Sequence, residues 1–351
     1  MMELYRFIIR AAALVLALSN TGTTSAEPNP DRHLKVGFIA PLSGAAAAYG
    51  TSAKNGFNLA LAEFGGGKVD VIFEDDQYTP AKTVAAFKKL VQIDRVDLIV
   101  SIASTPSNAI APLAEAAKIP LIAWANDPKV ARARSFVVIS EQSAEVEGAK
   151  IAREALRRGY QSLALVTSTG DYQSAVKDGL QKVVPTHVVF DEEMPAAEQY
   201  FRSLLGKIRA KNPSAIWICF QPGQFGIFAK QARELGINAP LFGCNAMQNS
   251  SELRISAGAL AGAWYVSPTV DEDFKKKYLT RFGNDDVIAG AAVHYEVGKL
   301  LAAFAHTAVQ RQGFMPWLFH SGEHRGAVGL FTVKRENEVQ YFDIQVAVKE
   351  L

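Results

Sequence analysis

Short apolar runs alternate with amphipathic stretches along the first third of the chain. The run KVGFIA at 35–40 has the length and composition of a buried strand, and the stretch 52–64 places Phe57, Leu61 and Phe64 at helical spacing. The alternation continues with strands predicted at 69–74, 98–102 and 121–124 and helices predicted at 80–93 and 105–118. Such alternation predicts parallel strands joined by right-handed crossovers, with helices on both faces of the sheet.

The pattern starts again near Ser140. It predicts helices at 144–158, 172–184, 199–211 and 222–235, and strands at 162–167, 188–190, 215–220 and 241–243. Two long helices, at 272–282 and 289–308, and β-type runs at 329–333 and 341–348 follow. We therefore expect an α/β protein of two doubly wound, Rossmann-like lobes. The predicted lobes are 33–140 with 268–318 and 141–267 with 319–351, and the chain crosses between them near Ser140, Ser267 and Phe319.

The N-terminus has the order of a secretory signal. Arg6 and Arg10 precede the apolar run AAALVLAL at 11–18, and small residues then lead to Ala26. We predict a signal peptide at 1–26 that is cleaved after Ala26. The alternative is a retained anchor, but the apolar run is well short of the ~20 residues that span a bilayer. No cysteine follows the run to accept a lipid, so a soluble exported protein is expected.

Composition and charge narrow the function. The 351 residues are 49% hydrophobic and 21% charged, which is typical of a globular protein. The formal net charge is +2, whereas a nucleic-acid-binding protein usually carries a strongly basic face. We therefore expect no nucleic-acid partner.

Cys219 and Cys244 are the two cysteines, and both fall at the ends of predicted strands. An exported protein meets an oxidising compartment, so a disulfide between them is possible. Neighbouring parallel strands rarely offer the geometry of a disulfide, and the sequence therefore favours two buried thiols.

Polar and aromatic residues follow the predicted strands of both halves. Ligands of open parallel sheets bind outside the carboxyl ends of the strands, so these loops are the candidate binding segments. Ser104 stands where a helix N-cap belongs, and a helix N-terminus attracts anions, although a capping role alone would explain it. The other candidates are Asn126 and Asp127, the loop Gly170-Asp171-Tyr172, Gln221 and Asn245. Two facing lobes would gather them in one cleft.

The sequence offers little for catalysis. The first strand is followed by Pro41-Leu42-Ser43-Gly44 in place of the glycine pattern of a dinucleotide site, and no G-x-S-x-G elbow or phosphate loop is present. His320 and His324 have metal-ligand spacing, but the residues between them predict a loop. Glu74-Asp75-Asp76 is an acidic cluster with no second catalytic group, which favours a solvated turn. We expect no enzymatic activity, no metal and no cofactor.

Several segments together resemble a known family. KVGFIAPLSG at 35–44, FEDDQYTPAKTVAAFKKLV at 73–91, PLIAWAND from Pro120 and QARELGI from Gln231 are similar to the periplasmic binding proteins of branched-chain amino-acid ABC importers. The resemblance extends from about Lys35 to the end of the chain. It implies the type I binding-protein fold, with two α/β lobes, three crossover strands and a hinge that closes on ligand. It also implies periplasmic location, a monomer, a small-molecule ligand and an ABC permease as partner.

The resemblance also implies the ligand-binding residues. Ser104 matches the serine that holds the ligand carboxylate, Tyr49 and Tyr172 match aromatic wall positions, and Ala125 matches a position of backbone contacts. The remaining positions depart from the family's residue types. Asp127 replaces a threonine, Gln221 an aromatic residue, Asn245 the glutamate that pairs with the ligand amine, and Gly290 a residue that is bulky in some members.

These departures change the expected ligand. A neutral Asn245 cannot form the ion pair that an α-ammonium group requires in a dry cleft, and Asp127 would repel a carboxylate placed beside it. Gly290 is expected to enlarge the pocket. The hypothesis is a small organic molecule other than a simple branched-chain amino acid, partly apolar and rich in hydroxyl or carbonyl groups. Two alternatives stay open: an amino-acid ligand with Asp127 as amine partner, and a sensor that presents its ligand to a membrane receptor.

Overall fold

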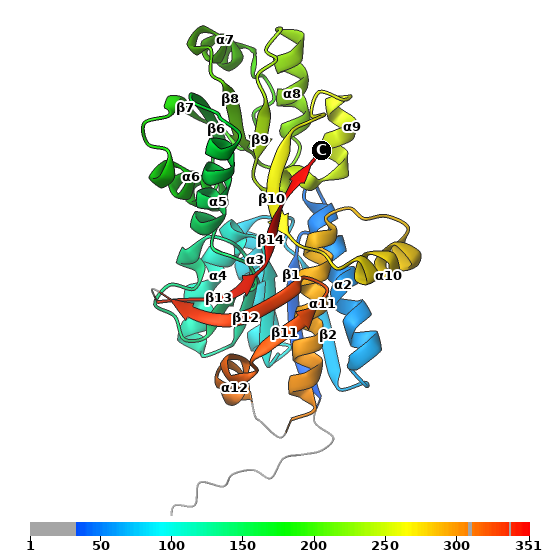
Figure 1. The fold of residues 1–351 in the computed structure, drawn as a ribbon. Helices are drawn as coiled ribbons and strands as arrows, with labels where there is room; N and C mark the ends of the chain where they lie inside the picture. The colour runs from blue at the N-terminus through cyan, green and yellow to red at the C-terminus, as the bar shows by residue number, and fades with distance from the viewer. Residues whose placement is uncertain (1–32, 308–310, 337) are drawn as a thin grey trace, which may run out of the picture. The chain divides into compact units, whose positions relative to one another are not determined.

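The computed structural model describes residues 33–307, 311–336 and 338–351, so the predicted signal peptide at 1–26 lies outside the described residues. The described chain contains an eight-stranded and a six-stranded sheet, each flanked by helices (Figure 1). The strand order is β11-β12-β13-β5-β4-β3-β1-β2 in the first sheet and β14-β10-β9-β8-β6-β7 in the second. The α/β class and the parallel cores predicted from the alternating pattern are confirmed.

The first sheet combines the N-terminal strands with a hairpin from the end of the chain. Its strands are β1 (Leu34–Ala40), β2 (Val69–Asp75), β3 (Leu98–Ile102), β4 (Leu121–Trp124), β5 (Val137–Ile139), β11 (Glu323–Gly326), β12 (Gly329–Glu336) and β13 (Val339–Ile344). Its helices are α2 (Ala47–Phe64), α3 (Pro80–Gln92), α4 (Ser104–Ala117), α10 (Glu272–Phe282), α11 (Ile288–Ala305) and α12 (Phe314–His320), with short 3₁₀ turns η1 (Pro128–Val130) and η3 (Arg311–Gly313). We call this part lobe 1.

The second sheet is formed by the middle of the chain and one C-terminal strand. Its strands are β6 (Leu163–Ser168), β7 (Val188–Met194), β8 (Ala215–Cys219), β9 (Leu241–Gly243), β10 (Trp264–Pro268) and β14 (Val346–Glu350). Its helices are α5 (Ala144–Arg157), α6 (Asp171–Val183), α7 (Arg202–Lys211), α8 (Phe225–Glu234) and α9 (Ser250–Ser256), with the 3₁₀ turn η2 (Asn245–Gln248). We call this part lobe 2.

The central strands are buried along their whole length, which explains their continuous apolar composition. Every residue of β3, β4, β6 and β8 is buried, as expected for parallel strands covered by helices on both faces. In lobe 1, α2 and α11 approach closely through Gly56, where a Cβ would lie 2.0 Å from the carbonyl oxygen of Ala291. This contact holds the start of α2, which carries Tyr49, beside the start of α11.

The chain crosses between the lobes three times, and the third crossing differs from the one expected. The first two follow β5 near Ser140 and β10 near Pro268, close to the predicted positions. The third was expected near Phe319, with 319–351 in lobe 2. Strands β11, β12 and β13 instead belong to the first sheet, and only β14 joins the second, so the chain crosses at Gln345 (Figure 1). The β-type run predicted at 341–348 is therefore two strands in two different sheets.

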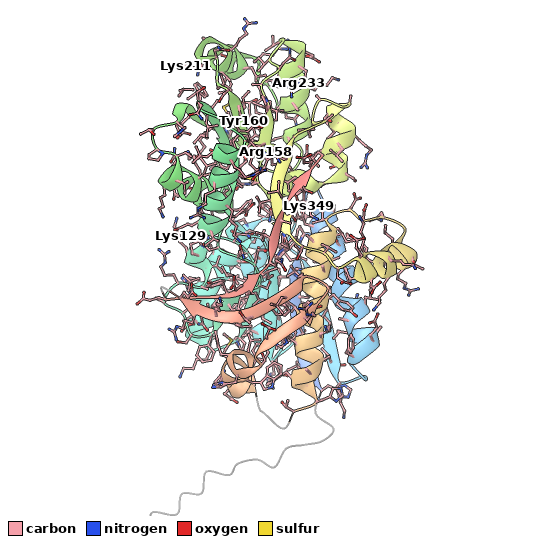
Figure 2. The ribbon with its side chains drawn as sticks, in the orientation of Figure 1. Lys129, Arg158, Tyr160, Lys211, Arg233 and Lys349 are labelled. Carbon is pink, nitrogen blue, oxygen red and sulfur yellow. A yellow bond between two sulfur atoms is a disulfide. The ribbon has the colours of Figure 1, made fainter. Side chains whose placement is uncertain are left out.

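Polar contacts hold the chain on either side of the third crossing. Arg158, labelled in Figure 2, donates from Nη2 to Glu350 over 2.9 Å, and its guanidinium lies 4.7 Å from the centre of the Trp264 ring. Gln142 in the first crossing donates its side-chain amide to the carbonyl of Ile344. Within the described ranges, no helix combines the length and apolar character needed to cross a membrane.

Candidate ligand-binding site

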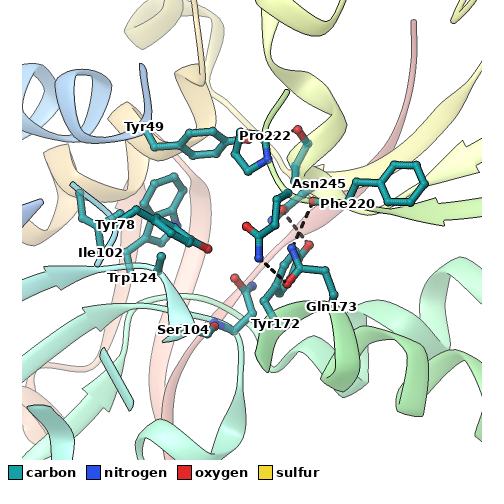
Figure 3. Close-up of a pocket in the computed structure, with 14 residues that line it drawn as sticks. Tyr49, Tyr78, Ile102, Ser104, Trp124, Tyr172, Gln173, Phe220, Pro222 and Asn245 are labelled. Atoms are coloured by element: carbon teal, nitrogen blue, oxygen red, sulfur yellow. Dashed lines mark hydrogen bonds between the residues drawn. The ribbon is translucent and has the colours of Figure 1, made fainter. Parts of the chain in front are cut away.

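A cavity lies where the carboxyl ends of the strands of both lobes meet (Figure 3). Lobe 1 and lobe 2 contribute equally to its wall, which is formed by Tyr49, Tyr78, Ile102, Ala103, Ser104, Trp124 and Asn126, and by Tyr172, Gln173, Phe220, Gln221, Pro222, Asn245 and Ala246. None of these residues carries a formal charge at neutral pH, so the wall is aromatic and polar but uncharged.

Ser104 begins α4 and holds the loop that follows β4. Its hydroxyl oxygen accepts hydrogen bonds from the backbone N–H groups of Asn126 and Asp127, both over 3.1 Å. Because these bonds occupy both lone pairs, the hydroxyl hydrogen remains to donate into the cavity. The expected N-cap role is wrong: the cap is Ala103, whose φ of 72° is strained for a residue with a Cβ.

Aromatic side chains of lobe 1 form one wall of the cavity. The ring centres of Tyr49 and Trp124 are 6.2 Å apart, and the Trp124 indole nitrogen donates to Glu141 over 3.0 Å. Tyr78 comes from the loop after β2 and also lines the cavity (Figure 3). Flat rings that are fixed in place in this way offer apolar contact area at little entropic cost.

The acidic cluster at 74–76 positions Tyr78. Asp75 accepts from the backbone of Leu42 and Gln77, over 2.9 and 3.0 Å. Asp76 is buried, accepts from the backbone of Tyr78 over 2.9 Å and from Thr83 Oγ1 over 2.8 Å, and therefore is not part of a solvated turn. These carboxylates hold the positive φ angles of Gln77 and Tyr78 and have a structural role.

On the side of lobe 2, Tyr172 connects the cavity to a buried acid. Its hydroxyl lies 2.8 Å from Asn245 Oδ1 and 2.8 and 3.0 Å from the two carboxyl oxygens of Glu147. Glu147 also accepts from the backbone N–H of Asn245 over 3.0 Å. Burial raises the pKa of Glu147 to about 8. Burial, and then the nearby Glu147, raise the pKa of Tyr172 well above its usual value.

Two glutamines complete the lobe 2 wall. Gln221 donates its side-chain amide to the carbonyl of Thr169 over 3.2 Å and to Gln173 Oε1 over 3.4 Å. Gln173 in turn donates to the carbonyl of Phe220 over 3.1 Å. This chain of amides makes this edge of the cavity polar.

The cavity brings together most, but not all, of the residues expected from the sequence. Tyr49, Ser104, Tyr172, Gln221 and Asn245 line it, whereas Ala125, Asp127 and Gly290 do not. Ala125 is buried, and its backbone N–H donates to the carbonyl of Ala123 over 2.9 Å.

Asp127 points away from the cavity. Its carboxylate is fully buried and accepts from Asn108 Nδ2 over 2.7 Å and from the backbone of Lys129 over 2.9 Å. Burial raises the pKa of Asp127. Asp127 therefore does not line the cavity, and its two oxygens are each engaged within the protein, so this conformation offers no direct contact between Asp127 and a ligand in the cavity.

Gly290 does not enlarge the cavity. A Cβ at this position would lie 2.5 Å from Cη2 of Trp124, so the indole ring already fills the space that the absent side chain leaves. The glycine instead allows Trp124 to pack against α11 and to remain in the wall. The expectation of a larger pocket is therefore wrong.

The sequence reasoning missed Tyr78, Trp124, Phe220 and Gln173. The first three follow or end β2, β4 and β8, so the rule that ligands bind at the carboxyl ends of strands could have found them. Gln173 lies in the first turn of α6, beside Tyr172, and carried no separate signal.

A disulfide joins Cys219 and Cys244, which contradicts the expectation of two thiols. Their Cα atoms are 5.4 Å apart, within the range that disulfides require. Cys219 ends β8 and Cys244 follows β9, so the chain has left the regular ladder where the two side chains converge. The bond braces the loops that carry Phe220 and Asn245.

Comparisons with known proteins agree with this architecture. A family model described as periplasmic binding protein matches residues 33–314. A Leu/Ile/Val-binding protein of Rhizobium johnstonii is 24% identical over 250 residues, which cover 67% of each chain. The Leu/Ile/Val-binding protein of Escherichia coli K12 is 24% identical over 271 residues, covering 74% of this chain and 72% of that protein.

Solved structures share the fold. A leucine-binding protein of Thermotoga maritima superposes with a TM-score of 0.85 at 21% identity, covering 91% of this chain and 95% of that one. A solute-binding protein of an ABC transporter from R. palustris, solved in complex with benzoate, has a TM-score of 0.81 at 20% identity, covering 91% and 93% of the two chains.

Proposed function

Because the chain belongs to the periplasmic binding protein family, we propose that it is the solute-binding receptor of an ABC importer and captures a small organic acid that carries no ammonium group. The protein is exported after removal of residues 1–26, acts as a monomer, and delivers its closed form to a membrane permease. A receptor of this family captures its solute without converting it, and we propose the same for this chain.

One observation carries the choice of ligand: none of the described residues that line this cavity has a carboxylate side chain. A buried ammonium group needs a charge partner or several strong acceptors, and Asn245 stands at the position expected to supply one. Glu147 lies behind Asn245 and is held by Tyr172 and by the Asn245 backbone. An α-amino acid would therefore lose the hydration of its ammonium group without compensation.

The lobe 1 wall favours a carboxylate at the other end of the ligand. Ser104 presents a hydroxyl hydrogen, and the N-terminus of α4 adds backbone donors and a partial positive charge. Tyr49, Tyr78 and Trp124 would contact a flat apolar body. The benzoate complex of a protein with the same fold supports this ligand class.

The test is a thermal-shift and calorimetric screen of the chain from Glu27 onward with benzoate, 4-hydroxybenzoate, aliphatic carboxylates and branched-chain amino acids. At about a hundred times its dissociation constant, a ligand should stabilise the fold by about 2.7 kcal/mol. We expect carboxylates with an apolar body to bind and leucine, isoleucine and valine to fail. Tight binding of leucine to the native chain would overturn the proposed ligand class.

A further inference from the structure

The hydrogen-bond count around Tyr172 constrains the protonation of its neighbours. The phenol oxygen lies 2.8 Å from Asn245 Oδ1 and 2.8 and 3.0 Å from the carboxyl oxygens of Glu147. A phenol has one hydrogen to donate. If Glu147 were ionised and Asn245 kept its carbonyl toward Tyr172, one of these short oxygen–oxygen contacts would contain no hydrogen.

Two arrangements place one hydrogen between Tyr172 and Asn245 and another between Tyr172 and the carboxyl group of Glu147. In the first, Glu147 carries a proton and donates it to Tyr172, Tyr172 donates to Asn245 Oδ1, and the NH₂ group of Asn245 is left for the cavity. In the second, Glu147 is ionised and accepts from Tyr172, while the amide of Asn245 is turned so that its NH₂ donates to Tyr172 and its carbonyl faces the cavity. The two differ in what residue 245 offers to a ligand.

The surroundings of Glu147 favour the first arrangement. Lys150, on the same helix, donates to Gln142 Oε1 over 2.9 Å, and among the described residues no ion pair with Glu147 is found. Glu141, in the first crossing, is a second buried acid whose charge opposes ionisation of Glu147. Tyr172 faces Glu147 from α6 and is itself uncharged. Burial of a carboxylate without a cation disfavours its ionised form, in agreement with the raised pKa of Glu147.

We infer that Glu147 is a positioning residue for ligand selectivity, which is uncharged and acts through Tyr172 to present the NH₂ group of Asn245 to the cavity. This end of the cavity therefore donates a hydrogen bond and selects a ligand with an oxygen acceptor there. The consequence for the ligand rests on the proposed function: the solute is an acid with a second oxygen, as hydroxyl, carbonyl or carboxylate, remote from the carboxylate held by Ser104.

The protonation of Glu147 is tested without any ligand. Glu147→Gln keeps an N–H donor for Tyr172 and an oxygen for the Asn245 backbone, so it mimics the protonated acid. We expect an infrared band of a protonated carboxylic acid at neutral pH, and this band should lose intensity in Glu147→Gln. The variant Glu141→Gln identifies how much of the same band comes from Glu141. Folding raises the pKa of Glu147 to about 8. The contribution of Glu147 to the free energy of unfolding is therefore fully present below its pKa in the unfolded chain and is lost as the pH rises through its pKa in the folded protein.

Melting curves at several pH values therefore provide the second readout. Glu147→Gln should match the native protein near pH 4 and become the more stable of the two as the pH approaches about 8. An unchanged infrared band, together with a variant that becomes less stable than native as the pH rises, would overturn the inference.

The orientation of the amide is tested by Asn245→Asp, which keeps the acceptor for Tyr172 and removes the NH₂ group. We expect little loss of melting temperature. The matched control is Asn126→Asp, because Asn126 Nδ2 donates to the carbonyl of Gln142 over 3.0 Å and the change removes that bond. A loss at residue 245 as large as that at residue 126 would favour the turned amide.

Binding of two probes separates this inference from the proposed function. The native protein and Glu147→Gln should bind 4-hydroxybenzoate about tenfold more tightly than benzoate, and Tyr172→Phe should lose the preference. If neither probe binds while the infrared and melting results hold, the ligand class fails and the role of Glu147 stands. Equal binding of both probes by the native protein would contradict the donor role of Asn245.

Discussion

Asn108 on α4 donates its side-chain amide to Asp171 on α6 over 3.2 Å, which joins lobe 1 to lobe 2 beside the cavity. The same nitrogen donates to Asp127 over 2.7 Å, so one amide lies between two carboxylates. Tyr49 makes a second contact between the lobes by donating to the carbonyl of Ala246 over 3.1 Å. Side chains of lobe 1 therefore form direct hydrogen bonds with lobe 2.

Asn108→Ala should weaken closure. The change leaves Asp127 and Asp171 without their shared donor, at a cost of about 1–3 kcal/mol to the closed state. Small-angle scattering should give a larger radius of gyration than the native value, and ligand affinity should fall by about tenfold or more. Asn55→Ala is the control, because Asn55 makes only a 3.5 Å contact with Tyr278 within lobe 1. An unchanged radius and affinity would contradict this role.

Ser104→Ala should reduce the affinity for a carboxylate by about tenfold to a hundredfold, because a hydrogen bond to a charged group contributes about 1.5–3 kcal/mol. Calorimetry with the ligand identified by the screen measures the loss. Ser107→Ala provides the comparison on the same helix, since Ser107 is buried against Ser101 over 2.8 Å and does not line the cavity. It should lower stability and leave affinity unchanged, and equal losses of affinity in both variants would exclude a direct role for Ser104.

Gly290→Ala should destabilise the protein by about 1–3 kcal/mol, because the new methyl group overlaps the Trp124 ring. The indole cannot retreat without breaking its bond to Glu141, so we also expect a change in tryptophan fluorescence. Gly206→Ala is the matched control: it lies inside α7, where a Cβ meets nothing within 4 Å, and should be neutral or stabilising. A Gly290 variant as stable as the Gly206 variant would show that the ring has room to move.

Replacing both Cys219 and Cys244 by serine should lower the free energy of unfolding by about 3 kcal/mol, since the bond closes a segment with a sequence separation of 25. Denaturant curves of the native protein with and without reductant should reproduce the difference. A thiol assay on the unmodified sequence after denaturation tests for the disulfide itself. It should detect no reactive thiol, and the detection of two would contradict the disulfide.

The sequence predicted the elements well where burial dominates. β1, β3, β6 and β8 are apolar runs because helices cover both faces of their sheets, and each begins and ends within one or two residues of its prediction. The third crossing was missed for a related reason. β13 and β14 are separated only by Gln345, and local composition does not indicate that neighbouring strands belong to different sheets.

The site was predictable as a set of loops but not in detail. Tyr49, Ser104, Tyr172, Gln221 and Asn245 line the cavity because strand ends converge there. The surroundings of Asp127 and Gly290 depend on how Asn108 and Trp124 pack against them. Such packing cannot be predicted from the spacing of residues along the chain. Glu147 lies about a hundred residues from Asn245 in sequence, and its contact with that residue exists only in three dimensions.

The position of Gln345 also constrains how the protein is made. β13 pairs with β5 and β14 pairs with β10, so neither sheet has all its strands until residues 339–350 have emerged. Both lobes must therefore complete their folding after most of the chain has been synthesised, and each must close contacts over a long sequence separation. A protein stopped before Val339 would lack a strand in each lobe, and the binding cavity would lose its support on both sides at once.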